Sequence, residues 1–97
     1  MRVIKKKTLR EFWGRFPDAE EALQAWHAEA EAATWKSPAD IKARFPSSSI
    51  LQENRVVFNI RGNKYRLVTK IHYNTGTVFI RFVGTHAEYD KIDAATI

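Results

Sequence analysis

A dense group of polar side chains lies near the end of the chain, directly after the last stretch that alternates apolar and polar residues. His86, Tyr89, Asp90 and Lys91 fall within six residues of one another. A histidine exchanges protons near neutral pH, and a tyrosine can stack on an unpaired base. Functional groups often follow a core strand in this way. An ordinary polar helix, with Tyr89 and Ile92 packed inward, explains the same residues equally well.

Charge along the chain is separated by sign. Residues 54–82 contain six basic side chains and no acid, whereas residues 18–35 contain five acids and neither Lys nor Arg. Because a solvated face normally mixes both signs, the basic segment predicts a surface that meets a polyanion. Chance in a chain of net charge +5 is the simpler alternative. The six basic residues are Arg55, Arg61, Lys64, Arg66, Lys70 and Arg81.

RNA is one polyanion on which such residues could perform chemistry. Its own 2′-OH can attack the adjacent phosphate, so a protein that promotes cleavage needs only a base, an acid and fixed positive charge on the transition state. Arginine suits the last role, because its planar fork binds phosphate and stays charged. The chain has no cysteine and only three scattered histidines, which predicts neither a metal site nor a cofactor.

The beginning of the chain predicts a strand and a short helix. Residues 1–5 carry the β-branched pair Val3 and Ile4, which is typical of a strand. A helix is expected over residues 9–16, with Thr8 as its N-cap and Glu11 completing a capping box. Pro17 would end it.

Two more helices are expected before residue 46. The first begins at Pro17 and runs to about Trp35, with His27 on its solvated side. The second begins at Ser37 and Pro38 and lasts one or two turns. The apolar stripe of the longer helix consists of Ala19, Leu23, Trp26, Ala30 and Ala33.

The rest of the chain predicts a three-stranded meander followed by a helical turn. The strands cover residues 55–60, 64–73 and 77–83, with turns between them, and the helical turn covers residues 87–92. Strand alternation separates a largely apolar face from a polar one that carries Lys64, Arg66, Lys70 and His72.

The expected order of elements is therefore β-α-α-(α)-β-β-β-(α), an α+β fold in which helices cover one face of an antiparallel sheet. The other face is expected to be free, with Arg66, His86 and Tyr89 converging at one of its edges. The length of 97 residues predicts one domain over residues 1–97. No apolar run could span a membrane and no signal peptide is recognisable, so a cytoplasmic protein is expected.

Two segments resemble a known family. Residues 54–68 read NRVVFNIRGNKYRLV and residues 83–92 read VGTHAEYDKI, and both are similar to the corresponding segments of HigB-type toxins. The upstream run Phe45-Pro46-Ser47 also fits that family. The resemblance covers essentially the whole chain.

The resemblance implies a RelE-like fold and cleavage of mRNA on translating ribosomes. It also implies a cognate antitoxin, usually a helix-turn-helix DNA-binding protein of the HigA type. In the wider superfamily a Tyr-Arg-Leu segment supplies a catalytic arginine, which maps to Arg66. His86, Tyr89 and Lys91 map to residues that transfer protons or stack on bases, without deciding which is acid and which is base. Substrate contacts are expected from Arg61, Lys64, Lys70 and Lys91.

A second class of function explains the same charge pattern. A non-catalytic module that binds RNA or the ribosome would block translation by occupancy alone. The two classes differ in whether transcripts are cut, which new 5′ ends in primer extension would show.

Overall fold

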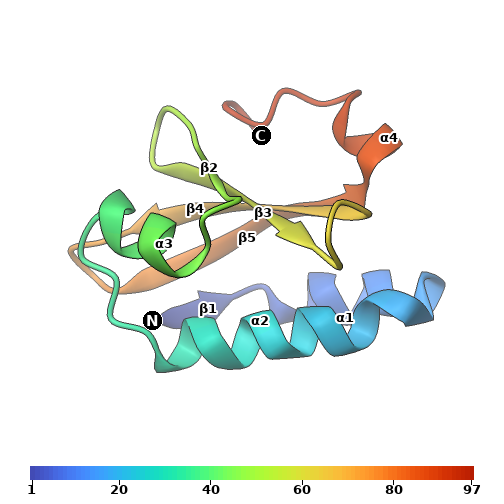
Figure 1. Ribbon diagram of the computed structural model, residues 1–97, viewed down its shortest axis with the longest axis horizontal. Helices are drawn as coiled ribbons and strands as arrows, with labels where there is room; N and C mark the ends of the chain where they lie inside the picture. The colour runs from blue at the N-terminus through green and yellow to red at the C-terminus, as the bar shows by residue number, and fades with distance from the viewer.

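Five strands form one sheet in the order β1-β5-β4-β3-β2 in the computed structural model, which describes residues 1–97 (Figure 1). The strands are β1 (Arg2–Ile4), β2 (Ser49–Ile50), β3 (Arg55–Ile60), β4 (Tyr65–His72) and β5 (Thr77–Thr85). The α+β class and the predicted meander are confirmed. The antiparallel prediction is wrong at β1, which pairs parallel with β5 because α1 and α2 carry the chain away before the meander begins. Two-residue β2 was not predicted, being too short to show alternation.

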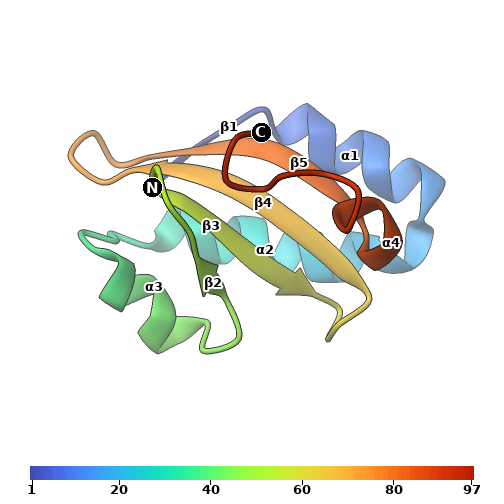
Figure 2. The same cartoon turned by 90° about the horizontal axis from the view of Figure 1, so that it is seen from above.

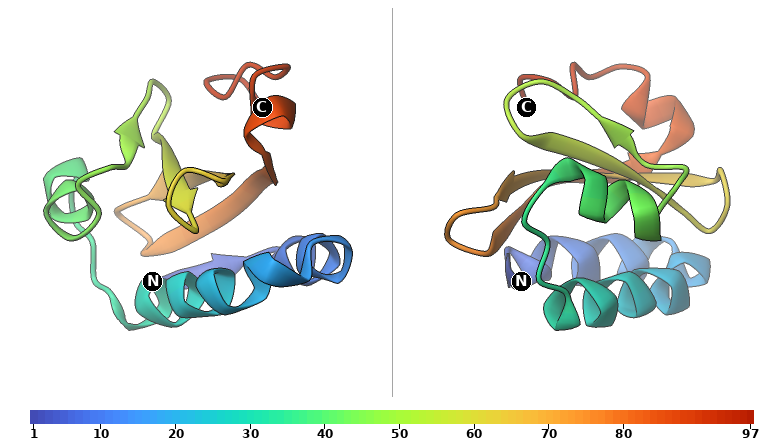
Figure 3. Two further views of the ribbon diagram at one scale, coloured as in Figure 1. Left: turned by 45° about the vertical axis from the view of Figure 1, so that its right-hand side comes forward. Right: turned by 60° about the vertical axis from the view of Figure 1, so that its left-hand side comes forward.

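The helices are α1 (Lys6–Arg15), α2 (Glu20–Ala32), α3 (Pro38–Arg44) and α4 (His86–Tyr89), with a 3₁₀ turn (Pro17–Ala19) between α1 and α2. Helices α1 and α2 lie side by side under one face of the sheet (Figures 1 and 3). Their buried side chains and those from the same face of the strands make the main core. No helix has both the length and the apolar character that crossing a membrane requires.

Helix α1 begins earlier than the sequence predicts. Lys5 precedes it with a φ of 71°, a left-handed conformation that turns the chain directly from β1 into the helix. Thr8 therefore lies inside the first turn, and the predicted capping box with Glu11 is wrong. Leu9 and Phe12 of this helix are buried, and Phe16, directly after it, is half-buried.

Helix α2 is shorter than predicted at both ends. The 3₁₀ turn replaces its first residues after Pro17, and the chain becomes extended at Ala33 instead of continuing to Trp35. Four residues of the predicted stripe, Ala19, Leu23, Trp26 and Ala30, are buried, whereas the fifth, Ala33, lies past the end of the helix and is half-buried. Ser37 and Pro38 begin α3 as expected.

The outer face of the sheet is not free, and that prediction is wrong. Helix α4 and the residues after it pass over β4 and β5 (Figures 1 and 2). Ala94 packs on Val57 and Val68 in a second apolar cluster. Arg55 and Arg81 both donate hydrogen bonds to the Ile97 carbonyl oxygen. Val68 lies between Arg66 and Lys70 on the predicted polar face of β4. The terminal segment covers this apolar residue, which explains its presence there.

Candidate active site

Arg66 lies on the outer face of β4, opposite Asn59 on β3 and Gly84 on β5. It is only 8% exposed, because the terminal part of the chain covers it. Its guanidinium donates to the side-chain oxygen of Asn63 at 2.7 Å and to the Asn63 carbonyl oxygen at 3.1 Å. The tight turn between β3 and β4 thus fixes the orientation of the arginine.

Tyr89 comes from α4 and lies against Arg66. The guanidinium carbon is 6.0 Å from the centre of the tyrosine ring, within the range of a cation–π contact. Tyr89 is half-buried and also packs against the second apolar cluster. The alternative that Tyr89 packs inward therefore holds together with the contact to Arg66.

The position of α4 depends on the residue before it, Thr85, and on its third residue, Glu88. The Thr85 hydroxyl accepts from the Glu88 backbone N–H at 3.1 Å, and the Glu88 carboxylate accepts from the Thr85 backbone N–H at 2.9 Å. This capping box holds the helix directly at the end of β5. The backbone bond from Thr85 lowers the pKa of Glu88, and its carboxylate also pairs with Arg15 at 3.6 Å.

His86 is the first residue of α4 and is about half exposed. Its Nδ1 lies 3.2 Å from a carboxylate oxygen of Asp90, one helical turn further on. The side chain lines a cleft of about 720 Å³ between the end of α1 and the start of α4, which we call the corner cleft. Lys64 lines the same cleft. Arg66 thus lies against Tyr89, whereas His86 and Lys64 line the same cleft.

Asp18 forms ion pairs with two cationic side chains at the other end of the corner cleft. Its carboxylate accepts from Arg61 at 2.6 Å and also from Lys64 and the Tyr65 hydroxyl. The bonds from Lys64 and Tyr65, more than the charge of Arg61, lower the pKa of Asp18 to about 2. Burial, then the bond to Asp18, raises the pKa of Tyr65. Arg61 and Lys64, both expected to contact substrate, therefore already have an internal partner, although half of each side chain stays exposed.

The remaining predicted substrate contacts lie further apart. Lys70 is half-buried on β4, level with Arg55 and Phe79 on the neighbouring strands. Lys91 is exposed just after α4.

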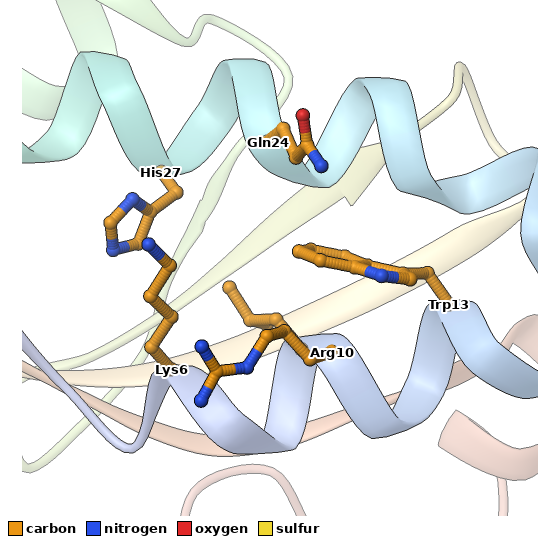
Figure 4. Close-up of a pocket in the computed structure, with 6 residues that line it drawn as sticks. Lys6, Arg10, Trp13, Gln24 and His27 are labelled. Carbon is orange, nitrogen blue, oxygen red and sulfur yellow. The ribbon is translucent and has the colours of Figure 1, made fainter.

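A second hollow, of about 370 Å³, lies between α1 and α2 and is lined by Lys6, Arg10 and Trp13 (Figure 4). Figure 4 places the Lys6 amine beside the ring of His27, which comes from α2. His27 is buried, so its predicted solvated position is wrong, and its Nδ1 lies 3.2 Å from Glu31. The polar side of α2 meets α1 at this point, which the pattern of one helix cannot reveal. Burial, assisted by the charge of Lys6, lowers the pKa of His27.

Three residues that shape the site were not identified from the sequence. Asn63 and Asp18 hold Arg66 and Lys64 in place, and Glu88 fixes α4. The spacing from Thr85 to Glu88 is a readable capping-box signal. The bond from Lys64 to Asp18 joins residues 46 positions apart, so it carries no local signal.

The fold and the site together define a small α+β protein that gathers arginine, lysine, histidine and tyrosine around the end of its central strands. The model of the HigB family, described as the RelE-like toxic component of a toxin–antitoxin system, matches residues 19–92. The chain is 32% identical over 96 residues to the mRNA interferase toxin HigB of Escherichia coli K12, covering 97% of this chain and 92% of that protein. It is 24% identical over 94 residues to the mRNA interferase HigB of Escherichia coli O6:H1, covering 95% and 91%. The chain belongs to the HigB family of RelE-like toxins.

Proposed function

We propose that this protein is a cytoplasmic toxin that cuts mRNA on the ribosome, without a metal ion, and that a helix-turn-helix antitoxin of the HigA type neutralises it. The single observation that carries the proposal is the contact of Arg66 with Tyr89, the last residue of α4, in a chain of this family whose α4 begins with His86. The residues that support it come from both segments of the sequence resemblance.

Arg66 stabilises the transition state in this proposal. Attack of the 2′-OH on the adjacent phosphorus forms one P–O bond while the bond to the 5′-oxygen breaks. The products are a 2′,3′-cyclic phosphate and a 5′-oxygen that takes up a proton from water to become a 5′-OH. Negative charge builds on the phosphoryl oxygens in between. Asn63 accepts two hydrogen bonds from Arg66 and the Tyr65 carbonyl oxygen accepts a third at 3.3 Å, which leaves the other donors of the planar fork for those oxygens.

His86 moves a proton and Tyr89 positions the substrate. In the neutral ring of His86, an Nδ1–H that donates to Asp90 leaves Nε2 without a proton, so Nε2 can take the proton of the attacking 2′-OH. Tyr89 stacks on a base or orients the 2′-OH. Lys70 and Lys91, with Arg61 and Lys64 where Asp18 releases them, hold phosphates on either side.

The test compares cleavage by Arg66→Lys, Arg66→Ala and His86→Gln with that of the native protein on ribosomes carrying a defined mRNA. Loss of Arg66 should slow cleavage about 100- to 1000-fold, and loss of His86 about 100- to 10,000-fold. Arg66→Lys keeps the charge and the buried stem, so it separates loss of the fork from loss of stability.

Primer extension measures the cuts and thermal unfolding measures the fold. Absence of new 5′ ends with the native protein would support inhibition by occupancy instead of cleavage. Activity that falls only in step with the unfolding temperature would make these residues structural.

A further inference from the structure

The corner cleft has two walls from parts of the chain that are distant in sequence. Arg15 and Phe16, at the end of α1, form one wall, and Thr85 and His86 form the other. The ion pair between Arg15 and Glu88 joins the two walls across 3.6 Å. The cleft is therefore a built feature of the fold and not a gap between independent loops.

The α1 wall presents flat surfaces. The Arg15 guanidinium lies 5.2 Å from the centre of the Phe16 ring, and Glu88 holds it from the side. Phe16 is itself supported by stacking on Phe12, with 4.8 Å between ring centres. Nearly two thirds of the Arg15 side chain stays exposed. Guanidinium planes and aromatic rings are the surfaces on which proteins stack splayed RNA bases.

The opposite side of the cleft supplies charge for a phosphate. Lys64 is held at its edge by Asp18, and an ammonium with one bond made still has two donors. His86 lines the same space. The cleft volume of about 720 Å³ falls within the range of pockets that hold small organic ligands, roughly 300–1000 Å³.

We propose that the corner cleft holds one nucleotide of the mRNA next to the cleaved bond. Its base lies against Arg15 and Phe16, and its phosphate lies toward Lys64 and His86. This inference rests on the proposed function, because it takes His86 to be at the reacting phosphate. It makes Arg15 and Phe16 specificity-determining residues, so that the protein itself contributes to the choice of base at the cut.

The test uses Arg15→Gln, Arg15→Lys and Phe16→Leu in the full-length protein, with Arg10→Gln as the matched control. Arg10 lies on the same helix as Arg15 and has the same charge, but it lines the hollow between α1 and α2 that Figure 4 shows. Cleavage is measured on ribosomes programmed with mRNAs that differ only in the nucleotides flanking the cut. Thermal unfolding shows whether Phe16→Leu, which also loses contacts to Phe12 and Tyr65, keeps its fold.

Arg15→Gln and Phe16→Leu should raise KM by roughly 5- to 150-fold, the range that stacking of one base is worth, and should leave kcat within about threefold. Both should also flatten the preference for one flanking base. Arg15→Lys should restore part of the binding but not the preference, because it returns the charge without the plane. Arg10→Gln should cut as the native protein does.

Two results would overturn the inference. Unchanged KM and base preference in both cleft variants would show that no nucleotide binds there. An equal effect of Arg10→Gln would show that general attraction is sufficient. Neither result would touch the proposed function while the native protein still cuts mRNA, whereas a native protein that cuts nothing would remove both.

Discussion

At the scale of single residues, the site depends on polar contacts that hold cations in place, several of them at the surface. Asp18 is the clearest case, because one carboxylate accepts bonds from Arg61, Lys64 and Tyr65. These bonds keep the carboxylate ionised to a lower pH than usual. They also set how much positive charge the protein can offer to RNA.

Replacing Asp18 should alter stability in acid. Its pKa falls from 3.8 to about 2 on folding, so the stability that ionised Asp18 contributes is present above about pH 4 and is lost as the pH falls toward 2. Urea unfolding of Asp18→Asn between pH 2 and 5 should therefore show a weaker pH dependence than the native protein. Glu20→Gln, at an exposed acid bonded only to Gln24, is the control. An unchanged slope in Asp18→Asn would contradict the assignment.

His27 should make stability depend on pH in the same direction at higher pH. Burial lowers its pKa from 6.5, so the folded protein favours the neutral ring. Stability from this source is complete above about pH 6.5 and decreases as the pH falls below it. His27→Gln should flatten the unfolding free energy between pH 7.5 and 5.5. Glu31→Gln should steepen it, because the Glu31 charge raises the His27 pKa; a flatter profile would refute this account.

The sequence identifies the candidate functional residues more readily than the neighbouring residues that fix their side chains in place. Arg66, His86 and Tyr89 could be selected because they stand in motifs of recognisable composition. Their surroundings could not be predicted, since Asn63 reaches Arg66 only after the turn closes and Asp18 reaches Lys64 only after α1 packs on the sheet. The exposure of Arg66 was overestimated because a chain segment that covers a sheet leaves no periodic pattern.

At the scale of elements, a short helix places two functional side chains. Helix α4 is only four residues long, and a helix of this length is not stable by itself and depends on its cap and on packing. Gly84, two residues before α4, leaves room for the Phe82 ring. A Cβ atom at position 84 would lie only 2.5 Å from Cζ of Phe82. A glycine at this position therefore lets the Phe82 ring pack against the end of β5, and α4 begins directly after that strand.

Removal of the cap should weaken both the helix and the activity. Thr85→Ala loses the hydroxyl that accepts from Glu88, which should cost about 0.5–2 kcal/mol of stability. Cleavage should fall by more than the fraction unfolded explains, because Tyr89 and His86 lose their positions. Thr85→Ser restores the hydroxyl and should recover both, as measured by urea unfolding and primer extension. Failure of serine to rescue activity would show that the cap does not position α4.

The elements themselves could be predicted where periodicity is strong. Strand β3 and the apolar stripe of α2 follow directly from alternation and from helical spacing. The start of α1 could not be predicted, because Lys5 takes a left-handed conformation that is unusual for lysine. The parallel pairing of β1 depends on where two helices return the chain, which local sequence does not specify.

At the scale of the whole molecule, much of the basic segment already makes bonds within the protein. If all six cations of residues 54–82 bound phosphates, the logarithm of RNA affinity would fall with the logarithm of salt with a slope of about −4. Arg55 and Arg81 bond to the Ile97 carbonyl, and Arg61 and Lys64 bond to Asp18. The surface therefore offers fewer free charges than the sequence suggests.

The salt dependence of binding should accordingly be shallower than −4. Fluorescence anisotropy with a 2′-O-methyl RNA, which lacks the attacking hydroxyl, measures affinity without cleavage. Asp18→Asn should steepen the slope by up to about 1.4, because it releases two cations at about 0.7 each. A native slope near zero would contradict electrostatic binding, and an unchanged slope in Asp18→Asn would show that those cations do not reach RNA.

The outermost strands of the sheet have a consequence for how the protein behaves at high concentration. Strand β1 has three residues and β2 has two, and α1 packs along β5, so neither border of the sheet ends in a long outer strand. Long outer strands with unpaired backbone groups allow separate molecules to pair with one another and aggregate. A toxin that is not bound to its antitoxin is free protein, and with such short outer strands we expect it to stay dispersed.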